Sequence, residues 1–315
     1  MWKTITFILL GLAASIAAAL AYGSHRWQAA TEEMHVNLEA ARRPVAPQTY
    51  SASELINLPA PVQRYFRAVL TEGQPMIAAV KVEHTGSFNM DPAGDQWKPF
   101  HSTQRVITQR PGFDWEARIA MMPGPRARVH DAYIAGEGIL HGSLFGLVSV
   151  VRIRSTREIA HGELLRFFAE AAWYPTALLP SQGVQWAAVD DHSATATLRD
   201  GDTSATLLFR FNADDMIDSG RAEARGALIN GVNVPTPWEG RFWIYELRVG
   251  MRAPLEGEVA WAKKEDPMMQ WFHRSGHPNW MARYMARLLL INHCSAVVHA
   301  LGVEPKYLVT LEVAV

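Results

Sequence analysis

The chain has 315 residues, of which 49% are apolar and 19% are charged, and its formal net charge is −1. This balance is typical of a folded domain, and it excludes both a disordered chain and a nucleic-acid-binding surface of strongly basic character. A single cysteine, Cys294, excludes an intrachain disulfide, so burial of the core has to stabilise the fold.

An apolar run, Ile5–Tyr22, opens the chain, and Lys3 is the cation before it. Its length is close to the lower limit of about 17 to 25 residues for a membrane-spanning helix. The run ends in an A-x-A pattern, Ala19–Ala21, which suits a cleaved signal peptide. Apolar residues continue at helical spacing through Trp27–Ala41, however, and this favours one uncleaved helix that leaves the bilayer.

Orientation of this segment follows from few charges, because Lys3 and Arg26 flank the apolar run almost evenly. We favour an amino terminus inside the cell, which places the domain of a bacterial inner-membrane protein in the periplasm or outside the cell. A buried core helix of a soluble protein is disfavoured, because terminal apolar runs this free of charge seldom fold inward.

Prolines mark a joint after the helical stalk. Pro44–Pro47 should be extended, because proline fixes its own φ and restricts the residue before it, so the stalk should end near Arg43. Beyond the joint, Ser51 and Glu54 have the spacing of a capping box. Pro61 then suits the first turn of a helix with the apolar residues Val62, Tyr65, Phe66 and Val69.

From Met76 onward the apolar period changes to two, which predicts strands separated by turns at 91–94, 110–112 and 123–125. In the strand after the second turn, one face carries apolar residues and the other carries Asp114, Glu116 and Arg118, as in a sheet with one dry face. The Asp-Gly pair within 199–202 predicts a hairpin. Further strands are expected over 216–224, 240–249 and 256–262.

One helix, Glu158–Trp173, interrupts the strands, and its broad apolar stripe predicts that it lies against the inner face of the sheet. The fold class is therefore mainly β (α+β), a large curved antiparallel sheet or open half-barrel with a covering helix, plus an N-terminal transmembrane helix. The expected divisions are a transmembrane anchor or signal peptide over 1–23, a helical stalk and joint over 24–50, a β-rich domain over 51–263 and a helical tail over 264–315.

Within the tail, Asn279–Leu301 is predicted to be a packing or membrane-surface helix. Its apolar residues are interrupted by Arg283 and Arg287, which argues against a second membrane span. Tyr307–Val315 is expected either to add a last edge strand or to be disordered.

Several blocks together resemble a bacterial domain family of unknown function over about residues 58–261. They are Leu58–Phe66, Arg110–Trp115, Asp131–Tyr133, the WYPTALLP block Trp173–Pro180, the TPWEG block Thr236–Gly240, and Gly250–Pro254. Each block alone is a weak signal, but their combination is specific. The resemblance implies an exported or membrane-attached β-rich domain, with an open half-barrel like those of lipoprotein carriers. A likeness of fold cannot assign a function.

Motifs for covalent catalysis and metal binding are lacking, so no catalytic residue, metal site or cofactor is predicted. Gly142-Ser143 lacks the first glycine of a nucleophile elbow, and Cys294 lies in an apolar segment. His273 and His277 are four residues apart, but Gly276 and Pro278 disfavour the helix that would align them. His130 and Asp131 should point to opposite faces of their strand. The sequence therefore leans away from an enzyme.

A pocket of carboxylates and indoles is the ligand site that the sequence suggests. Asp131 and Tyr133 share a strand face, and Glu170 lies one turn before two aromatic residues. The predicted ligand-binding residues are Trp115, Asp131, Tyr133, Glu170, Trp173, Tyr174 and Trp238. The alternative is that the aromatic residues are core anchors, and that Glu170 or Asp131 is a buried salt-bridge partner of Arg118, Arg166 or Arg241.

The sequence is compatible with three functions. A membrane-tethered domain could bind a hydrophobic or amphiphilic small molecule between sheet and helix. Alternatively, it could be a scaffold of a membrane complex that presents a strand edge or the tail helix. The third reading is a hydrolase-like enzyme with Glu170 or Asp131 as acid or base. The expected partners are the membrane and such a small molecule, with no nucleic acid, while a protein partner stays unknown.

Overall fold

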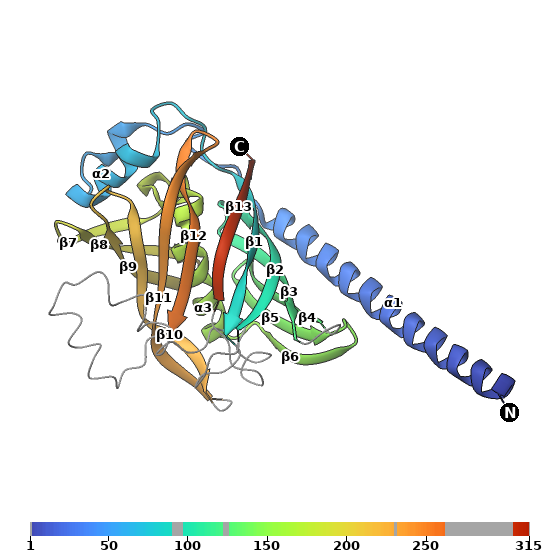
Figure 1. Cartoon of the computed structure of the whole chain (residues 1–315). Helices are drawn as coiled ribbons and strands as arrows, with labels where there is room; N and C mark the ends of the chain where they lie inside the picture. Colours follow the sequence, from blue (N-terminus) through green and yellow to red (C-terminus); the bar gives the residue numbers. More distant parts are fainter. Residues whose placement is uncertain (1, 90–96, 122–125, 230–231, 262–304, 315) are drawn as a thin grey trace.

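The computed structural model describes residues 2–89, 97–121, 126–229, 232–261 and 305–314. In this part of the chain, thirteen strands form one sheet in the order β6-β5-β4-β3-β2-β1-β13-β12-β11-β10-β9-β8-β7 (Figure 1). All neighbours pair antiparallel. The strand bounds are β1 Ala79–Asn89, β2 Trp97–Ile107, β3 Gly112–Ala120, β4 Arg126–Ile134, β5 Glu137–Leu144, β6 Val148–Arg154, β7 Gln185–Asp190, β8 Ser193–Asp200, β9 Thr203–Phe211, β10 Ile217–Ile229, β11 Val232–Arg248, β12 Met251–Trp261 and β13 Pro305–Ala314.

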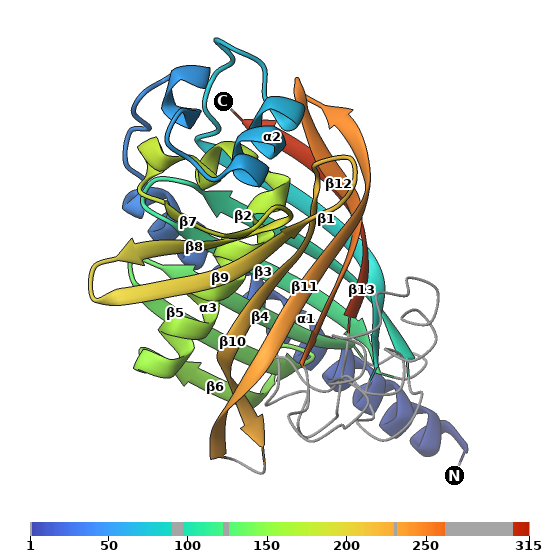
Figure 2. The ribbon, with the colours of Figure 1, turned by 90° about the vertical axis from the view of Figure 1, so that its left-hand side faces the viewer.

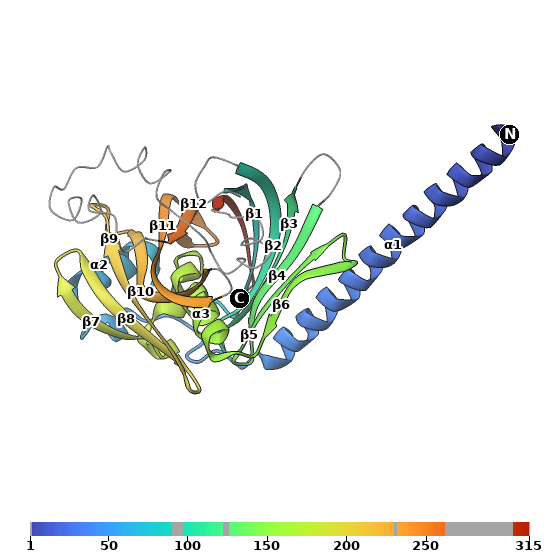
Figure 3. The same ribbon diagram turned by 90° about the horizontal axis from the view of Figure 1, so that it is seen from below.

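The sheet curls around a central helix, so the prediction of a curved, mainly β fold with a covering helix is confirmed (Figures 2 and 3). That helix, α3 (Arg157–Ala169), begins at Thr156, whose side chain accepts a hydrogen bond from the Ile159 amide. Ten of its thirteen residues are buried, as expected of a helix enclosed on all sides. Three short 3₁₀ helices continue it along the concave side: η2 (Glu170–Trp173), η3 (Pro175–Leu178) and η4 (Pro180–Gln182).

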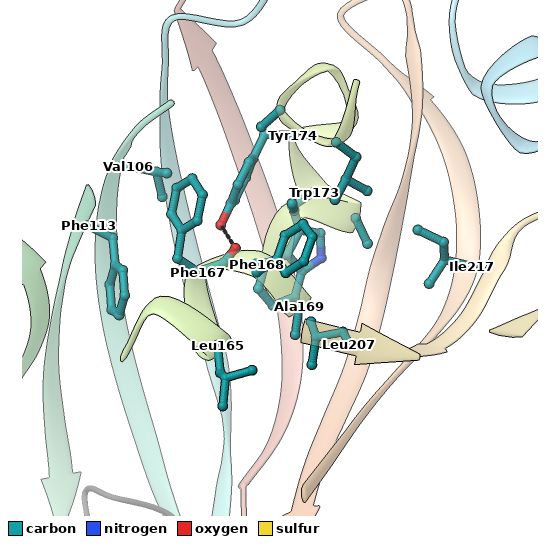
Figure 4. Packing of buried hydrophobic residues seen from close by; sticks show 14 of the residues in the cluster. Val106, Phe113, Leu165, Phe167, Phe168, Ala169, Trp173, Tyr174, Leu207 and Ile217 are labelled. Carbon is teal, nitrogen blue, oxygen red and sulfur yellow. Dashed lines mark hydrogen bonds between the residues drawn. The ribbon is translucent and has the colours of Figure 1, made fainter. Parts of the chain in front are cut away.

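Aromatic residues from α3 and η2 fill the space between the two halves of the sheet. Phe168 packs edge-on against Phe209 of β9, with ring centroids 5.7 Å apart. The Tyr174 hydroxyl donates to the Phe167 carbonyl oxygen over 2.6 Å (Figure 4). The interior of the half-barrel is thus a packed core around these residues.

Helix α1 (Trp2–Ala41) is continuous and projects from the domain (Figure 1). It is the one helix in the described residues that is long and apolar enough to cross a membrane. The short helices predicted after the joint are η1 (Ala52–Leu55) and α2 (Ala60–Val69), and the Ser51 side chain caps the first.

Strand β13 corrects the prediction of a terminal edge strand or disorder. It lies between β1 and β12 and joins the two meanders, pairing for example Val82 with Leu311 and Gly257 with Tyr307. Its position depends on β1, whose paired residues lie more than 200 positions earlier in the sequence, and on β12, whose paired residues lie about 50 positions earlier, and local patterning reveals neither. The helix predicted over 279–301 lies outside the described residues.

Candidate functional site

The seven residues predicted to bind a ligand are all buried and lie on the concave side, or on the η2 segment that fills it. Trp115 comes from β3, Asp131 and Tyr133 from β4, Trp238 from β11, and Glu170, Trp173 and Tyr174 from η2 and its end. They do not form one pocket. They are divided mainly between two buried guanidinium groups, Arg166 and Arg225.

Arg166 brings three of the predicted residues together. Its Nη1 donates to Asp131 Oδ2 over 2.5 Å, and its Nε donates to Glu170 Oε1 over 2.8 Å. The guanidinium lies 4.8 Å from the centre of the Trp115 ring, within reach of a cation–π interaction. Glu170 also accepts a 2.6 Å bond from Gln104 Nε2. Asp131 and Glu170 are therefore buried salt-bridge partners of Arg166, which was the alternative prediction.

Arg225 forms the second centre, opposite α3. Its Nη2 lies 3.4 Å from Glu163 Oε1, and its guanidinium stacks 4.7 Å from the Trp238 ring and 5.5 Å from the Trp261 ring. Burial, followed by the nearby charge of Asp131, raises the pKa of Glu163 well above its ordinary value despite the two arginines. The geometry and charge of this centre favour a neutral Glu163.

The other predicted residues have structural contacts. Tyr133 donates to Asp200 Oδ2 over 2.9 Å, and the same carboxylate accepts from Arg110. The Trp173 ring packs 5.2 Å from His84, whose pKa burial lowers to about 3, so this imidazole is neutral. Ligand binding by the seven residues stays a prediction.

Helix spacing was the signal that would have identified the charged centres. Glu163, Arg166 and Glu170 are separated by three and four residues, so they project from one side of α3 and its η2 extension. Arg166 was among the partners predicted for Glu170, whereas Glu163 and Arg225 were not among the predicted residues.

A separate polar cluster lies on the convex face, where α1 packs on β3 and β4. Asp114 accepts from His130 Nδ1 over 2.8 Å and lies 3.2 Å from His35 Nε2 of α1. Thr31 Oγ1 is 2.9 Å from His130 Nε2, and the Trp27 ring stacks on the His130 ring at 4.7 Å. His130 therefore faces away from Asp131, as the strand geometry predicts.

This cluster corrects the expectation that the Asp114 face of β3 is solvated. Asp114 is fully buried because α1 covers it. Burial alone would raise the pKa of Asp114, but His130 and His35 hold it below its ordinary value. On the same face, the Trp27 indole donates to Glu116 Oε1 over 2.9 Å. The polar residues thus hold the helix on the sheet.

Two grooves flank the docked half of α1. The first, of about 510 Å³, lies toward β4–β6 and combines an apolar floor with charged groups; its lining includes Ala30, Met34, Ala40, Ile139, Ile153, Arg152 and Arg154. The second, of about 680 Å³, lies toward β1 and β2, with Val36, Val80, Lys81 and Arg105 in its lining. Neither is lined by any of the seven predicted residues.

Among the residues that the structure describes, no three His, Cys, Asp or Glu side chains gather as a metal site. Asp131 and Glu170 are 0% and 4% exposed and are held by Arg166, so acid–base catalysis would first have to break these ion pairs.

Comparison with known proteins gives a family. A search of curated proteins found no match. Among solved structures, the crystal structure of a LolA superfamily protein from Nitrosomonas europaea is similar at 9% identity with a TM-score of 0.31, over 81% of this chain and 92% of that chain. The sequence matches a family described as a family of unknown function (DUF6920) over residues 56–275, which confirms the resemblance seen in the sequence. Because this match spans more than half of the chain, the protein belongs to the DUF6920 family.

Proposed function

We propose that this protein is a membrane-tethered domain of the cell envelope that binds an amphiphilic, lipid-like molecule beside its anchor helix. Tethering is supported by α1, whose amino-terminal half projects from the domain with large apolar side chains exposed, among them Phe7 at 73% and Leu10 at 61%. Such a surface is stable in a bilayer and costly in water.

The first groove beside α1 carries the binding proposal. Its floor of alanine, isoleucine and methionine side chains suits an acyl chain, while Arg152 and Arg154 at its edge suit an anionic head group. Arg154 is already paired with Glu137 over 3.1 Å, and Arg152 is exposed on the edge strand β6. Ala30 lies about 12 Å along the helix from the end of the apolar run at Tyr22, at 1.5 Å per residue.

The proposed binding site lies on the convex side of the sheet, whereas the site predicted from the sequence lies on the concave side. The concave site is not proposed because Arg166, Arg225 and their carboxylates occupy the space among the predicted residues. In the proposed orientation, the amino terminus is inside the cell and the domain outside the inner membrane.

Filling the groove tests the proposal. Ala40→Trp should reduce the amphiphile that co-purifies with the full chain in lipid nanodiscs by about tenfold, which corresponds to a loss of about 1.4 kcal/mol. Native mass spectrometry measures the occupancy. Val36→Trp is the matched control, because Val36 is exposed on the same helix but lines the second groove. Equal occupancy in all three proteins would reject the site.

A scaffold is the second candidate, favoured by an exposed apolar tip at the turn between β11 and β12. Ile244, Leu247 and Val249 are 50%, 67% and 58% exposed there. The tip lies at the top of the molecule in Figure 1, away from the amino terminus of α1. A photo-crosslinker at Leu247 that captures one defined protein in cells, with a ligand-free groove, would favour this candidate.

A further inference from the structure

The turn between β5 and β6 exposes apolar side chains at an unusual place. It is closed by a 3.0 Å bond from the Leu147 amide to the Leu144 carbonyl, and its central residues, Phe145 and Gly146, have φ values of 56° and 73°. Such turns favour Asn, Asp or Gly at both central positions. Phe145 is instead 37% exposed, and Val148 beside it is 62% exposed.

This turn touches α1 at the end of the apolar run. A Cβ atom on Gly23 would lie 2.5 Å from the Phe145 carbonyl oxygen, and a Cβ on Gly146 would lie 2.2 Å from the Gly23 carbonyl oxygen. Only glycine at both positions permits this approach of the two backbones. Figures 1 and 3 show the tip of the β5–β6 hairpin beside the helix.

The contact lies at the level where a bilayer would end. Trp2 and Tyr22 are twenty residues apart on α1, which is about 30 Å and matches the hydrocarbon thickness. Tryptophan and tyrosine are the side chains enriched at the two membrane interfaces. Gly23 follows Tyr22 directly, so the tip of the hairpin would lie among the head groups.

Cations surround the same contact. Arg26 Nη2 lies 3.5 Å from the Leu147 carbonyl oxygen, and Arg128 Nη2 donates to Ser24 Oγ over 3.0 Å. Arg128 is directly opposite Arg118 in the β3–β4 register, an arrangement that costs energy between like charges. Glu116 Oε1 is 3.8 Å from Arg118 Nη2 and also accepts a hydrogen bond from the Trp27 indole. Arg128 Nη1 is buried, and in the described part of the chain it has no hydrogen-bond partner.

We infer that the β5–β6 tip, Leu144–Val148, is a second membrane contact, which inserts Phe145 and Val148 into the surface of an anionic bilayer while Arg26 and Arg118 bind lipid phosphates. The inference rests on the anchoring role proposed for α1. Two contacts on one bilayer would fix the orientation of the domain, which a single helix leaves free to rotate. Cations near an anionic surface and buried apolar side chains both favour this contact.

Fluorescence quenching of labels at single cysteines tests the contact in the full chain. In a Cys294→Ser background, an environment-sensitive label is placed at Phe145→Cys. A second variant, Val148→Cys, carries the same label, so that the test does not depend on Phe145→Cys alone if that substitution disturbs the turn. Leu9→Cys reports the anchor, and Val189→Cys, 53% exposed on the far edge strand β7, is the surface control. The proteins are reconstituted in phosphatidylglycerol vesicles that contain nitroxide-labelled lipids.

We expect shallow nitroxides to quench the labels at positions 145 and 148 at least threefold more than the label at position 189. Deep nitroxides should quench the label at position 9. Quenching at both tip positions no greater than at Val189, with Leu9 quenched, overturns the inference and leaves the anchor intact. An unquenched Leu9 label overturns the anchor and the inference together. Phosphatidylcholine vesicles, or Arg118→Gln in anionic vesicles, should lower the quenching at the tip; no change in either would overturn the role of the arginines.

Discussion

At the scale of single residues, the buried charges between sheet and α3 balance only if one carboxyl is neutral. Asp131, Glu163 and Glu170 supply three negative charges, while Arg166 and Arg225 supply two positive ones. Burial, as the first cause, raises the pKa of Glu163 and so favours it as the protonated member. Glu163 Oε2 accepts no hydrogen bond among the described residues, and a proton on this atom lets it donate instead.

Glu163→Gln should therefore remove a pH dependence of stability. A carboxyl whose pKa is raised in the folded state contributes stability that is complete below its unfolded pKa and is lost as the pH rises toward the folded pKa. Between about pH 5 and 8, the free energy of unfolding of the wild type should fall by on the order of 1–3 kcal/mol more than that of the variant. Denaturant titrations at several pH values measure this. Glu158→Gln, exposed on the same helix, should keep the wild-type slope, and a wild-type slope in Glu163→Gln would contradict the assignment.

The candidate site shows how far residue-level reasoning reaches. Burial of Trp115 and Trp238, and an ion pair for Asp131 or Glu170, follow from residue type and strand alternation. The choice of Arg166 as their common partner depends on how far β4 lies from α3, which no local pattern encodes. Polar groups in aromatic surroundings are compatible both with a pocket and with a satisfied core, so residue types alone do not choose between them.

At the scale of elements, α1 has two halves with different surroundings. Its first half has the composition of a membrane span, and its second half is held on the sheet by Trp27, Thr31 and His35. The helix itself was predictable from its apolar spacing. That it would cover the polar face of β3 was not, because Asp114 and Glu116 look solvated until a partner element supplies their hydrogen bonds.

Trp27→Ala should detach the stalk without unfolding the sheet. The substitution removes the stacking on His130 and the hydrogen bond to Glu116, and buried tryptophan-to-alanine changes cost about 3–5 kcal/mol. Hydrogen exchange should rise in Thr31–Ala41 and stay unchanged in β8 and β9. Trp2→Ala, at a side chain 85% exposed, is the matched control and should leave both regions as they are. Equal protection of the stalk in the two variants would show that Trp27 does not hold it.

At the scale of the whole molecule, the half-barrel consists of two six-stranded meanders that β13 joins. Hairpins within each meander follow from turns such as Asp200–Gly201, which the sequence revealed. The junction between the meanders does not follow from local turns, because β1 and β12 are paired with residues near the carboxyl terminus. Long-range pairing of this kind is set by the closure of the whole sheet, and a terminal apolar segment carries no sign of its partners.

Removal of residues 305–315 should therefore expose the long edge of β1, which pairs with β13 from Ala79 to Phe88, and a short stretch of β12, Glu256–Glu258, in the middle of the sheet. Unpaired edges of this length recruit other chains, so the truncated protein should aggregate under conditions in which the full chain in detergent remains monodisperse by light scattering. A synthetic peptide of Pro305–Ala314 added during refolding should restore the monodisperse state, because it can pair with both edges. A control peptide with alternate residues replaced by proline should not restore it, since proline cannot donate a hydrogen bond to the strand ladder. A truncated protein that stays monodisperse without peptide would mean that β1 and β12 close the sheet without this strand.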